Sequence, residues 1–299
     1  MKSYVLPLLA AMAFVQCPLA YGQGKITQPE VSEKACPLEI VSVERDGLKP
    51  FAVVRKPPGK GPFPLLIYIH GGTAPRRQKS LMEESRGNVT LCRFLQAGYV
   101  VANATYTQRP EGKRLHSKMR EALKDCVALM AGLKKMPEVD PKSVLVLGSS
   151  GGGNLALELA DQTELCAVVG AEPATIILAG LDRSAMANPK QAYDAQAQKI
   201  TRDKIARIRC PILIVHGDVH EINKFNNDVY IPELKAAGKK VEVIYYPGAP
   251  HALALGRNTA PETTKKVFDD CNAFFMRHLP TQPRPVEKSL VREVPVSGK

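Results

Sequence analysis

The chain of 299 residues has no tryptophan, and aromatic residues make up only 6% of it. Sugar-binding surfaces commonly use tryptophan as a stacking side chain, so its absence argues against a dedicated carbohydrate-binding surface. No Cys-x-x-Cys pair and no cysteine/histidine cluster has metal-ligand spacing, so we predict no zinc or other metal site. No motif indicates a cofactor either.

Long apolar runs are missing except at the start of the chain. There, an apolar run over residues 4–15 is followed by small residues at Ala20 and Gly22. This pattern predicts a signal peptide over residues 1–22, cleaved after Gly22, and hence a secreted or periplasmic protein. The run is too short to cross ~30 Å of hydrocarbon, and no later segment resembles a membrane span, so we expect no stable membrane insertion.

Six of the seven cysteines follow the predicted cleavage site. An even number in an exported protein permits disulfides, while the apolar surroundings of several of them are equally compatible with buried free thiols.

Charge is unbalanced, with 41 Lys and Arg against 29 Asp and Glu and a formal net charge of +12. Such a surface attracts anionic material. However, no basic recognition helix or interleaving of arginine with aromatics is present, so nucleic acid is not an expected partner.

Hydrophobic patterning predicts alternating strands and helices. We expect strands over 38–44, 51–55, 64–69, 99–104, 144–147, 167–170, 212–215 and 241–246, and helices over 81–96, 116–135, after 153, over 225–237 and near the end. This alternation predicts an α/β fold with a doubly wound, mostly parallel sheet in one domain over residues 23–279. The segment 174–209 is expected to form a small cap, and residues 280–299 an extended or disordered tail.

The strongest motif is Gly148-Ser149-Ser150-Gly151-Gly152, a G-x-S-x-G pattern between a predicted strand and a predicted helix. A serine on such a sharp turn is exposed in strained backbone geometry, and its neighbours must be small so that adjacent backbone passes closely. The helix that follows adds amide groups and partial positive charge where an oxyanion would develop. No lysine follows the glycines, so a phosphate-binding loop is disfavoured and Ser150 is predicted to be a nucleophile.

Two further motifs complete this site. His70-Gly71-Gly72 ends an earlier buried strand, and in G-x-S-x-G hydrolases such a loop supplies an oxyanion donor, so Gly71 and Gly72 are predicted to act with Gly151. His251 follows the last predicted strand late in the chain, as the order serine, acid, histidine requires. It is therefore preferred to His216 and His278 as the general base.

These motifs, in this order over residues 38–279, resemble the α/β-hydrolase superfamily. Within it, the chain is most similar to dienelactone-hydrolase-like and prolyl-oligopeptidase-like esterases without a propeller. The resemblance implies an eight-stranded sheet and a serine-histidine-acid triad with Ser150 and His251. The acid is less direct, because His220 occupies the position of the carboxylate in the pattern HGxxD. Glu221, one residue later, is our choice, with Asp218 and Glu172 as alternatives.

Substrate contacts are expected from loops at the carboxyl edge of the sheet. Arg76, Arg77 and Arg109 lie on two such loops and suggest an acidic substrate group. In the cap, residues 176–178 (Ile176, Ile177 and Leu178) are expected to contact the substrate.

We therefore expect a secreted serine hydrolase that cleaves a small-molecule or saccharide-linked carboxylic ester through an acyl-enzyme on Ser150. One alternative is a peptidase of the prolyl-oligopeptidase-like type, which the lack of a propeller before residue 38 disfavours. The other is an inactive binding protein with the same fold.

Overall fold

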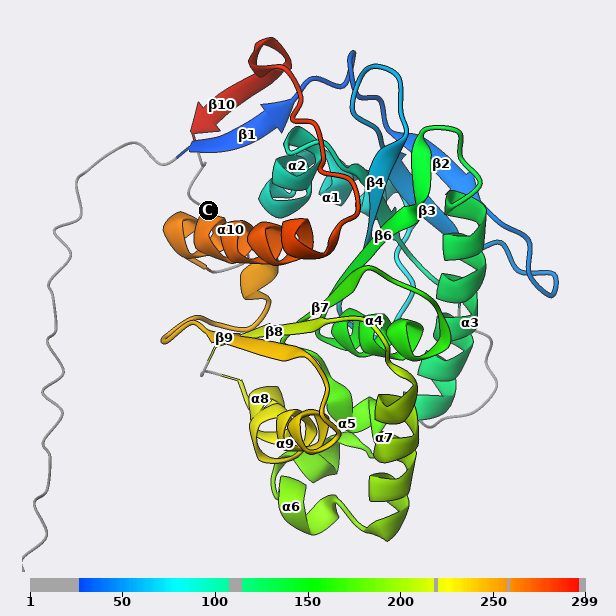
Figure 1. Ribbon diagram of the computed structural model, residues 1–299, viewed down its shortest axis with the longest axis vertical. Helices are drawn as coiled ribbons and strands as arrows, with labels where there is room; N and C mark the ends of the chain where they lie inside the picture. Colours follow the sequence, from blue (N-terminus) through cyan, green and yellow to red (C-terminus); the bar gives the residue numbers. More distant parts are fainter. Residues whose placement is uncertain (1–26, 108–114, 218–219, 257–258, 296–299) are drawn as a thin grey trace, which may run out of the picture.

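A computed structural model describes residues 27–107, 115–217, 220–256 and 259–295 (Figure 1). The predicted signal peptide at residues 1–22 lies outside this described part.

The elements alternate along the chain as the patterning predicts. The strands are β1 (Thr27–Val31), β2 (Glu39–Ser42), β3 (Phe51–Arg55), β4 (Phe63–Ile69), β5 (Val100–Ala104), β6 (Val139–Ser149), β7 (Ala167–Ala171), β8 (Ile212–His216), β9 (Val241–Tyr245) and β10 (Val291–Pro295). The α-helices are α1 (Gln78–Gly87), α2 (Val89–Gln96), α3 (Leu115–Leu133), α4 (Gly151–Gln162), α5 (Thr175–Leu178), α6 (Pro189–Ala192), α7 (Ala195–Arg207), α8 (Ile222–Phe225), α9 (Ile231–Ala236) and α10 (Pro261–His278). Shorter turns are the 3-10 helices η1 (Arg183–Met186), η3 (Leu253–Leu255) and η4 (Lys288–Leu290), and the π-helical turn η2 (Asn226–Tyr230).

Eight strands form one sheet in the order β2-β3-β5-β4-β6-β7-β8-β9. The pairs β2–β3 and β3–β5 are antiparallel, and every pair from β5 to β9 is parallel. The predicted doubly wound, mostly parallel eight-stranded sheet is confirmed. Because the parallel strands all run in one direction, the loops after β4, β6, β7, β8 and β9 meet at one edge of the sheet.

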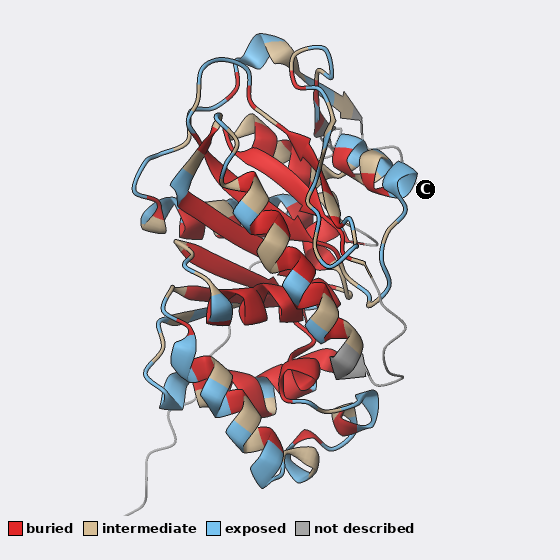
Figure 2. Ribbon diagram, turned by 90° about the vertical axis from the view of Figure 1, so that its right-hand side faces the viewer, coloured by how far each residue is buried: buried red, intermediate tan, exposed pale blue. Residues whose placement is uncertain are grey.

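The sheet is buried on both faces, which explains why its central strands read as continuous apolar runs. Along β4, Leu65, Ile67 and Ile69 face a core with α3 and α4, while Leu66 and Tyr68 face a second core with α2 and α10. Figure 1 shows these helices on opposite sides of the sheet, and Figure 2 shows that burial is concentrated in the strands and the helix faces against them.

The helix predicted over 81–96 is two helices, α1 and α2, with a break at Asn88. The side chain of Asn88 accepts hydrogen bonds from the backbone amides of Thr90 (3.0 Å) and Leu91 (3.1 Å) and so caps α2. Asparagine after Gly87 competes with helix continuation through this local bond, a signal that apolar periodicity alone does not reveal.

The tail, expected to be extended or disordered, has defined structure over residues 288–295. Its strand β10 pairs antiparallel with β1, from Thr27–Pro295 to Val31–Val291. The two strands lie more than 250 residues apart in sequence, so no local pattern could indicate their pairing.

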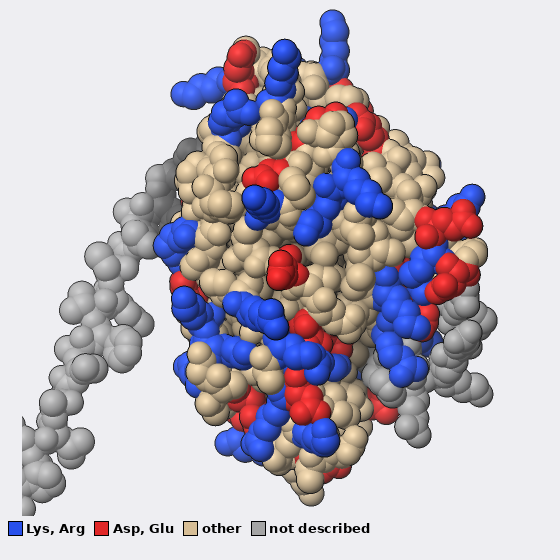
Figure 3. Space-filling model, turned by 45° about the vertical axis from the view of Figure 1, so that its right-hand side comes forward, with Lys and Arg blue, Asp and Glu red and all other residues tan. Residues whose placement is uncertain are grey.

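The surface mixes both signs of charge. Figure 3 shows basic side chains interspersed with acidic ones over the face in view, and several form ion pairs, such as Arg202–Glu233 (2.9 Å) and Arg277–Glu242 (2.6 Å). Within the described part of the chain, no helix combines the length and apolarity needed to cross a bilayer. The six cysteines after the predicted cleavage site are free thiols.

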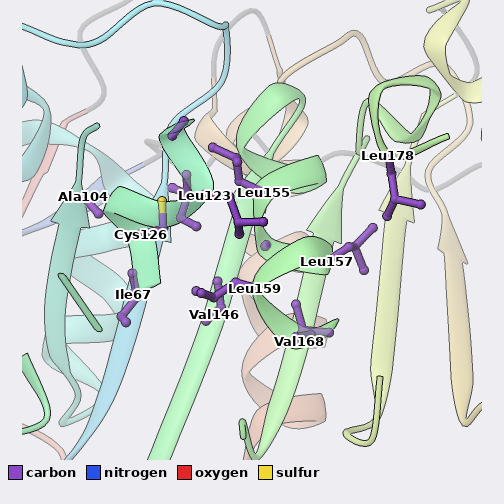
Figure 4. Packing of buried hydrophobic residues seen from close by; sticks show 14 of the residues in the cluster. Ile67, Ala104, Leu123, Cys126, Val146, Leu155, Leu157, Leu159, Val168 and Leu178 are labelled. Carbon is purple, nitrogen blue, oxygen red and sulfur yellow. The ribbon is translucent and has the colours of Figure 1, made fainter. Parts of the chain in front are cut away.

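We predict that Leu155→Ala destabilises the domain by about 2–5 kcal/mol, because it leaves a cavity in a close-packed core. Leu155 of α4 is fully buried in the core next to α3, near Leu123 (Figure 4). Urea unfolding followed by circular dichroism measures the change, with Leu155→Met as the volume-conserving control at under about 1.5 kcal/mol. Equal loss in both variants would contradict a tightly packed core at this position.

Candidate active site

Ser150 lies on the turn between β6 and α4 with φ 54° and ψ −117°, a conformation that a non-glycine residue rarely adopts. Neighbouring backbone holds the turn. The amide of Ser150 donates to the carbonyl of Ala171 (2.9 Å), and its carbonyl accepts from the amides of Asn154 (3.0 Å) and Ala174 (2.9 Å). The strained turn at the predicted nucleophile is thus enforced by β7 and α4.

The glycines around Ser150 are required by close backbone approaches. A Cβ atom at Gly148 would lie 2.0 Å from the carbonyl oxygen of Gly152, and one at Gly152 would lie 2.1 Å from that of Ile69. A Cβ at Gly151 would lie 2.2 Å from the carbonyl oxygen of Gly72. A side chain at Gly151 or Gly152 would push the serine turn away from β4 and the loop after it, and one at Gly148 would push the end of β6 away from α4.

The loop after β4 is held by His70, whose ring is fully buried. Its Nδ1 lies 2.9 Å from the carbonyl oxygen of Gly71 and its Nε2 lies 3.0 Å from Oγ1 of Thr105. Since a carbonyl can only accept, Nδ1 bears the proton in this arrangement. The ring also stacks on Tyr106 (4.9 Å between centroids), whose hydroxyl donates to the carbonyl of Gly72 (3.1 Å). The peptide groups at Gly71 and Gly72 are therefore fixed in orientation.

Of the three glycines predicted to bind an oxyanion, Gly72 and Gly151 line the same cavity as Ser150. Gly71 packs behind the serine, where a Cβ atom would lie 3.3 Å from Cβ of Ser150. The structure therefore brings Gly72 and Gly151 to the cavity and gives Gly71 a packing position.

His251 also lines this cavity, and its partner is Glu172. Nδ1 of His251 lies 3.3 Å from Oε2 of Glu172, which follows β7 and is 1% exposed. The same Oε2 accepts a hydrogen bond from the backbone amide of Ala252 (2.6 Å). Oε1 accepts one from Nδ2 of Asn223 (3.3 Å). Burial by itself raises the pKa of Glu172, but the contact with His251 and these hydrogen bonds outweigh it and hold the pKa below its ordinary value.

The structure brings Glu172, and not the predicted Glu221, to the ring of His251. Glu221 is exposed at the rim of the cavity, at the start of α8, while Glu172 contacts His251. Because β7 and β8 are neighbours in the sheet, the sequence places a carboxylate after each strand close to the loop after β9, and only the packing decides that Glu172 is the one in contact. Glu172 is one of the two alternatives that the sequence offers, and the other, Asp218, lies outside the described residues.

The cavity has a volume of about 420 Å³ and a mixed apolar and polar lining. The segment 174–209, predicted as the cap, supplies five of its lining residues: Ala174, Ile176, Ile177, Arg183 and Met186. Thr73, His220, Glu221 and Ile222 complete the lining. Leu178, expected to contact substrate, is fully buried in the core with α4 and α7 instead.

Of the arginines predicted to contact the substrate, Arg76 and Arg77 do not line the cavity. The backbone amide of Arg76 donates to Oγ1 of Thr105 (2.9 Å), and its guanidinium lies 4.0 Å from Glu84. Arg77 is exposed immediately before α1, and Arg109 lies outside the described residues. Instead, Arg183 of η1 lines the cavity, together with Glu221 of opposite charge. Cap residues such as Arg183 follow no motif, so the sequence contains no signal for this one.

His220 is the feature of the site that the motifs did not assign. Its ring stacks on that of His251, with centroids 4.1 Å apart and planes 24° apart. Its Nδ1 accepts the backbone amide of Ile222 at 3.2 Å. Burial, followed by the charge on His251, lowers the pKa of His220 below its ordinary value.

Among the residues that the structure describes, no group of three or more His, Cys, Asp or Glu could hold a metal ion. What the arrangement offers chemically is a hydroxyl that lines the cavity, an imidazole backed by a buried carboxylate, and backbone amides on the same cavity.

Comparisons with known proteins agree with this architecture. Two curated relatives are alpha/beta hydrolase domain-containing protein 17B of Homo sapiens, 27% identical over 186 residues, and protein 17C of Mus musculus, 26% identical over 189 residues. Each match covers 62% of this chain, and 59% and 53% of the relatives, so the chain spans a little over half their length.

Among solved structures, an esterase from Pyrobaculum calidifontis superposes with a TM-score of 0.59 at 18% identity, covering 81% of this chain and 86% of that one. Carboxyl esterase 2 of Tuber melanosporum superposes with a TM-score of 0.61 at 21% identity, covering 82% and 87%. At these identities the likeness shows the fold. The model of the dienelactone hydrolase family matches residues 85–279, more than half of the sequence, and the chain therefore belongs to that family.

Proposed function

We propose that the protein hydrolyses carboxylic esters through an acyl-enzyme on Ser150. The observation on which this rests is that Ser150 and His251 line one cavity while the buried carboxylate of Glu172 lies 3.3 Å from Nδ1 of His251. The names of the solved neighbours, which are esterases, favour esters over other acyl compounds.

The proposed reaction begins when Ser150 Oγ adds to the ester carbonyl and His251 accepts its proton on Nε2. In this scheme the ionised Glu172 accepts a hydrogen bond from the Nδ1–H group of His251, which keeps the proton on Nδ1 and leaves Nε2 free as the base. The negative charge of Glu172 then stabilises the imidazolium. The protonated ring then donates to the leaving alcohol, and water releases the acyl group by the same steps in reverse order.

Backbone amides at Gly72 and Gly151 stabilise the oxyanion in this scheme. Gly151 begins α4, so the positive end of the helix dipole faces the same point. Because the glycine contacts fix the serine turn against the β4 loop, these donors require no rearrangement as charge develops.

We propose that the preferred substrates are small neutral esters. Among the described residues that line the cavity, five are apolar, and the positive charge of Arg183 is accompanied by the negative charge of Glu221, so this part of the lining does not select an acid. This proposal replaces the acidic substrate group that Arg76, Arg77 and Arg109 suggested.

The main alternative is a catalytically inactive binding protein, and a fluorophosphonate probe distinguishes the two. We expect the probe to label the wild-type protein at one residue and to leave Ser150→Ala unlabelled, because only an activated serine reacts. Gel fluorescence measures the labelling, with Ser149→Ala as the neighbouring control that keeps it. An unlabelled but folded wild-type protein would overturn the proposed function.

Removing the charge of Glu172 should lower kcat. A glutamine at position 172 has no negative charge to keep the proton of His251 on Nδ1 or to stabilise the imidazolium. We therefore expect kcat of Glu172→Gln on a p-nitrophenyl ester to fall by about 10³- to 10⁴-fold. The matched control is Glu221→Gln, an exposed carboxylate on the same cavity, which should change kcat little. The reverse ranking would restore Glu221 as the acid.

The same pair of variants tests the electrostatics of Glu172. Its pKa is lowered in the folded protein, so the ionised form adds stability that is present above the unfolded pKa and lost as pH falls through the native pKa. The gap in urea midpoint between wild type and Glu172→Gln should therefore shrink as pH falls below 5, roughly the upper edge of carboxylate titration. A gap independent of pH would contradict the proposed ionised state.

Acyl preference follows from the lining of the cavity. We expect a higher kcat/KM for p-nitrophenyl butyrate than for the hemisuccinate ester of the same alcohol, because the latter brings a carboxylate beside Glu221. Initial rates at equal ionic strength measure the ratio. A preference for the hemisuccinate would show that Arg183 outweighs Glu221.

A further inference from the structure

His220 stands where the pattern HGxxD expects a carboxylate, yet the carboxylate at His251 comes from Glu172 on the neighbouring strand end. One edge of the His251 ring is thus already supported without position 220. The side chain of His220 contacts the other part of that ring, its face, at 4.1 Å and 24°.

The two contacts restrain different motions of His251. An interaction at Nδ1 anchors one atom and leaves the ring able to tilt about it, whereas a stacked neighbour fixes the plane in which Nε2 lies. Since Nε2 must point at the hydroxyl of Ser150, the plane of the ring decides whether proton transfer is in line.

The hydrogen bonding of His220 favours its neutral form. Its Nδ1 accepts the amide of Ile222, so this nitrogen presents a lone pair and the proton of the neutral ring is on Nε2. Protonation at Nδ1 would break this bond.

The charges around His220 also favour its neutral form. A neutral imidazole can stack favourably on the imidazolium that His251 becomes during the reaction, in the manner of a cation on an aromatic face. A protonated His220 would put two like charges about 4 Å apart. Arg183 adds to that repulsion, while Glu172 and Glu221 oppose it, and burial and His251 together lower the pKa of His220.

We propose that His220 is a positioning residue for His251: its neutral ring holds the plane of the His251 imidazole by stacking and accommodates the positive charge that this imidazole gains. The inference rests on the proposed function, in which His251 is the base. It predicts that the face of the ring matters more than its nitrogen atoms, and that activity requires both histidines to be neutral.

Three variants test it with p-nitrophenyl butyrate: His220→Ala, His220→Phe, and His278→Ala as a control. His278 packs edge-on against Phe274 of α10, outside the cavity. We expect His220→Ala to lose about 10- to 100-fold in kcat with KM nearly unchanged, because a base displaced by about 1 Å transfers protons poorly. His220→Phe should recover most of that loss, and His278→Ala should behave as the wild type. Thermal unfolding of each variant separates these effects from loss of fold.

The pH profile supplies a readout that a purely structural role would not change. In the wild type, log kcat/KM should fall at low pH with a limiting slope of two, because two coupled imidazoles must lose their protons. In His220→Phe the limiting slope should be one.

Wild-type kcat in His220→Ala, no recovery in His220→Phe, or a limiting slope of one in the wild type would each overturn the role of His220. These outcomes are distinct from failure of the proposed function, which would appear as a wild-type protein that the fluorophosphonate probe does not label.

Discussion

The site depends on how closely backbone segments approach one another at the carboxyl edge of the sheet. Positions 148, 151 and 152 have carbonyl oxygens 2.0–2.2 Å from where a side chain would begin. These approaches tie the turn after β6 to the end of β4 and to the first turn of α4. Because the serine has positive φ, its conformation persists only while these contacts surround it.

The order of the strands determines which charged and polar groups surround His251. Strands β6, β7 and β8 are adjacent and parallel, so the residues after them, Ser150, Glu172 and His220, reach the loop that contains His251. Glu172 is buried, yet its pKa is held below the ordinary value, because two hydrogen bonds and the contact with His251 compensate for lost solvation. With a carboxylate supplied after β7, the position after β8 is free for a histidine, His220, which stacks on His251.

The sequence allowed the fold to be predicted, because strand and helix periods alternate and the buried strands are continuously apolar. It also indicated Ser150, Gly72, Gly151 and His251, each of which lies in a motif with a steric or chemical cause. The identity of the acid was not predictable, since Glu172 and Glu221 follow adjacent strands and only the packed structure decides which reaches His251. Arg183 and the pairing of β1 with β10 were equally hidden, because they depend on contacts between distant segments.

The proposed acyl-enzyme on Ser150 can be observed directly. Wild-type protein mixed with p-nitrophenyl butyrate, quenched in acid during turnover and digested, should yield a butyryl adduct on the peptide that contains Ser150. The adduct should accumulate more if water attack is slow relative to acylation. An adduct on another residue, with none on Ser150, would contradict the account.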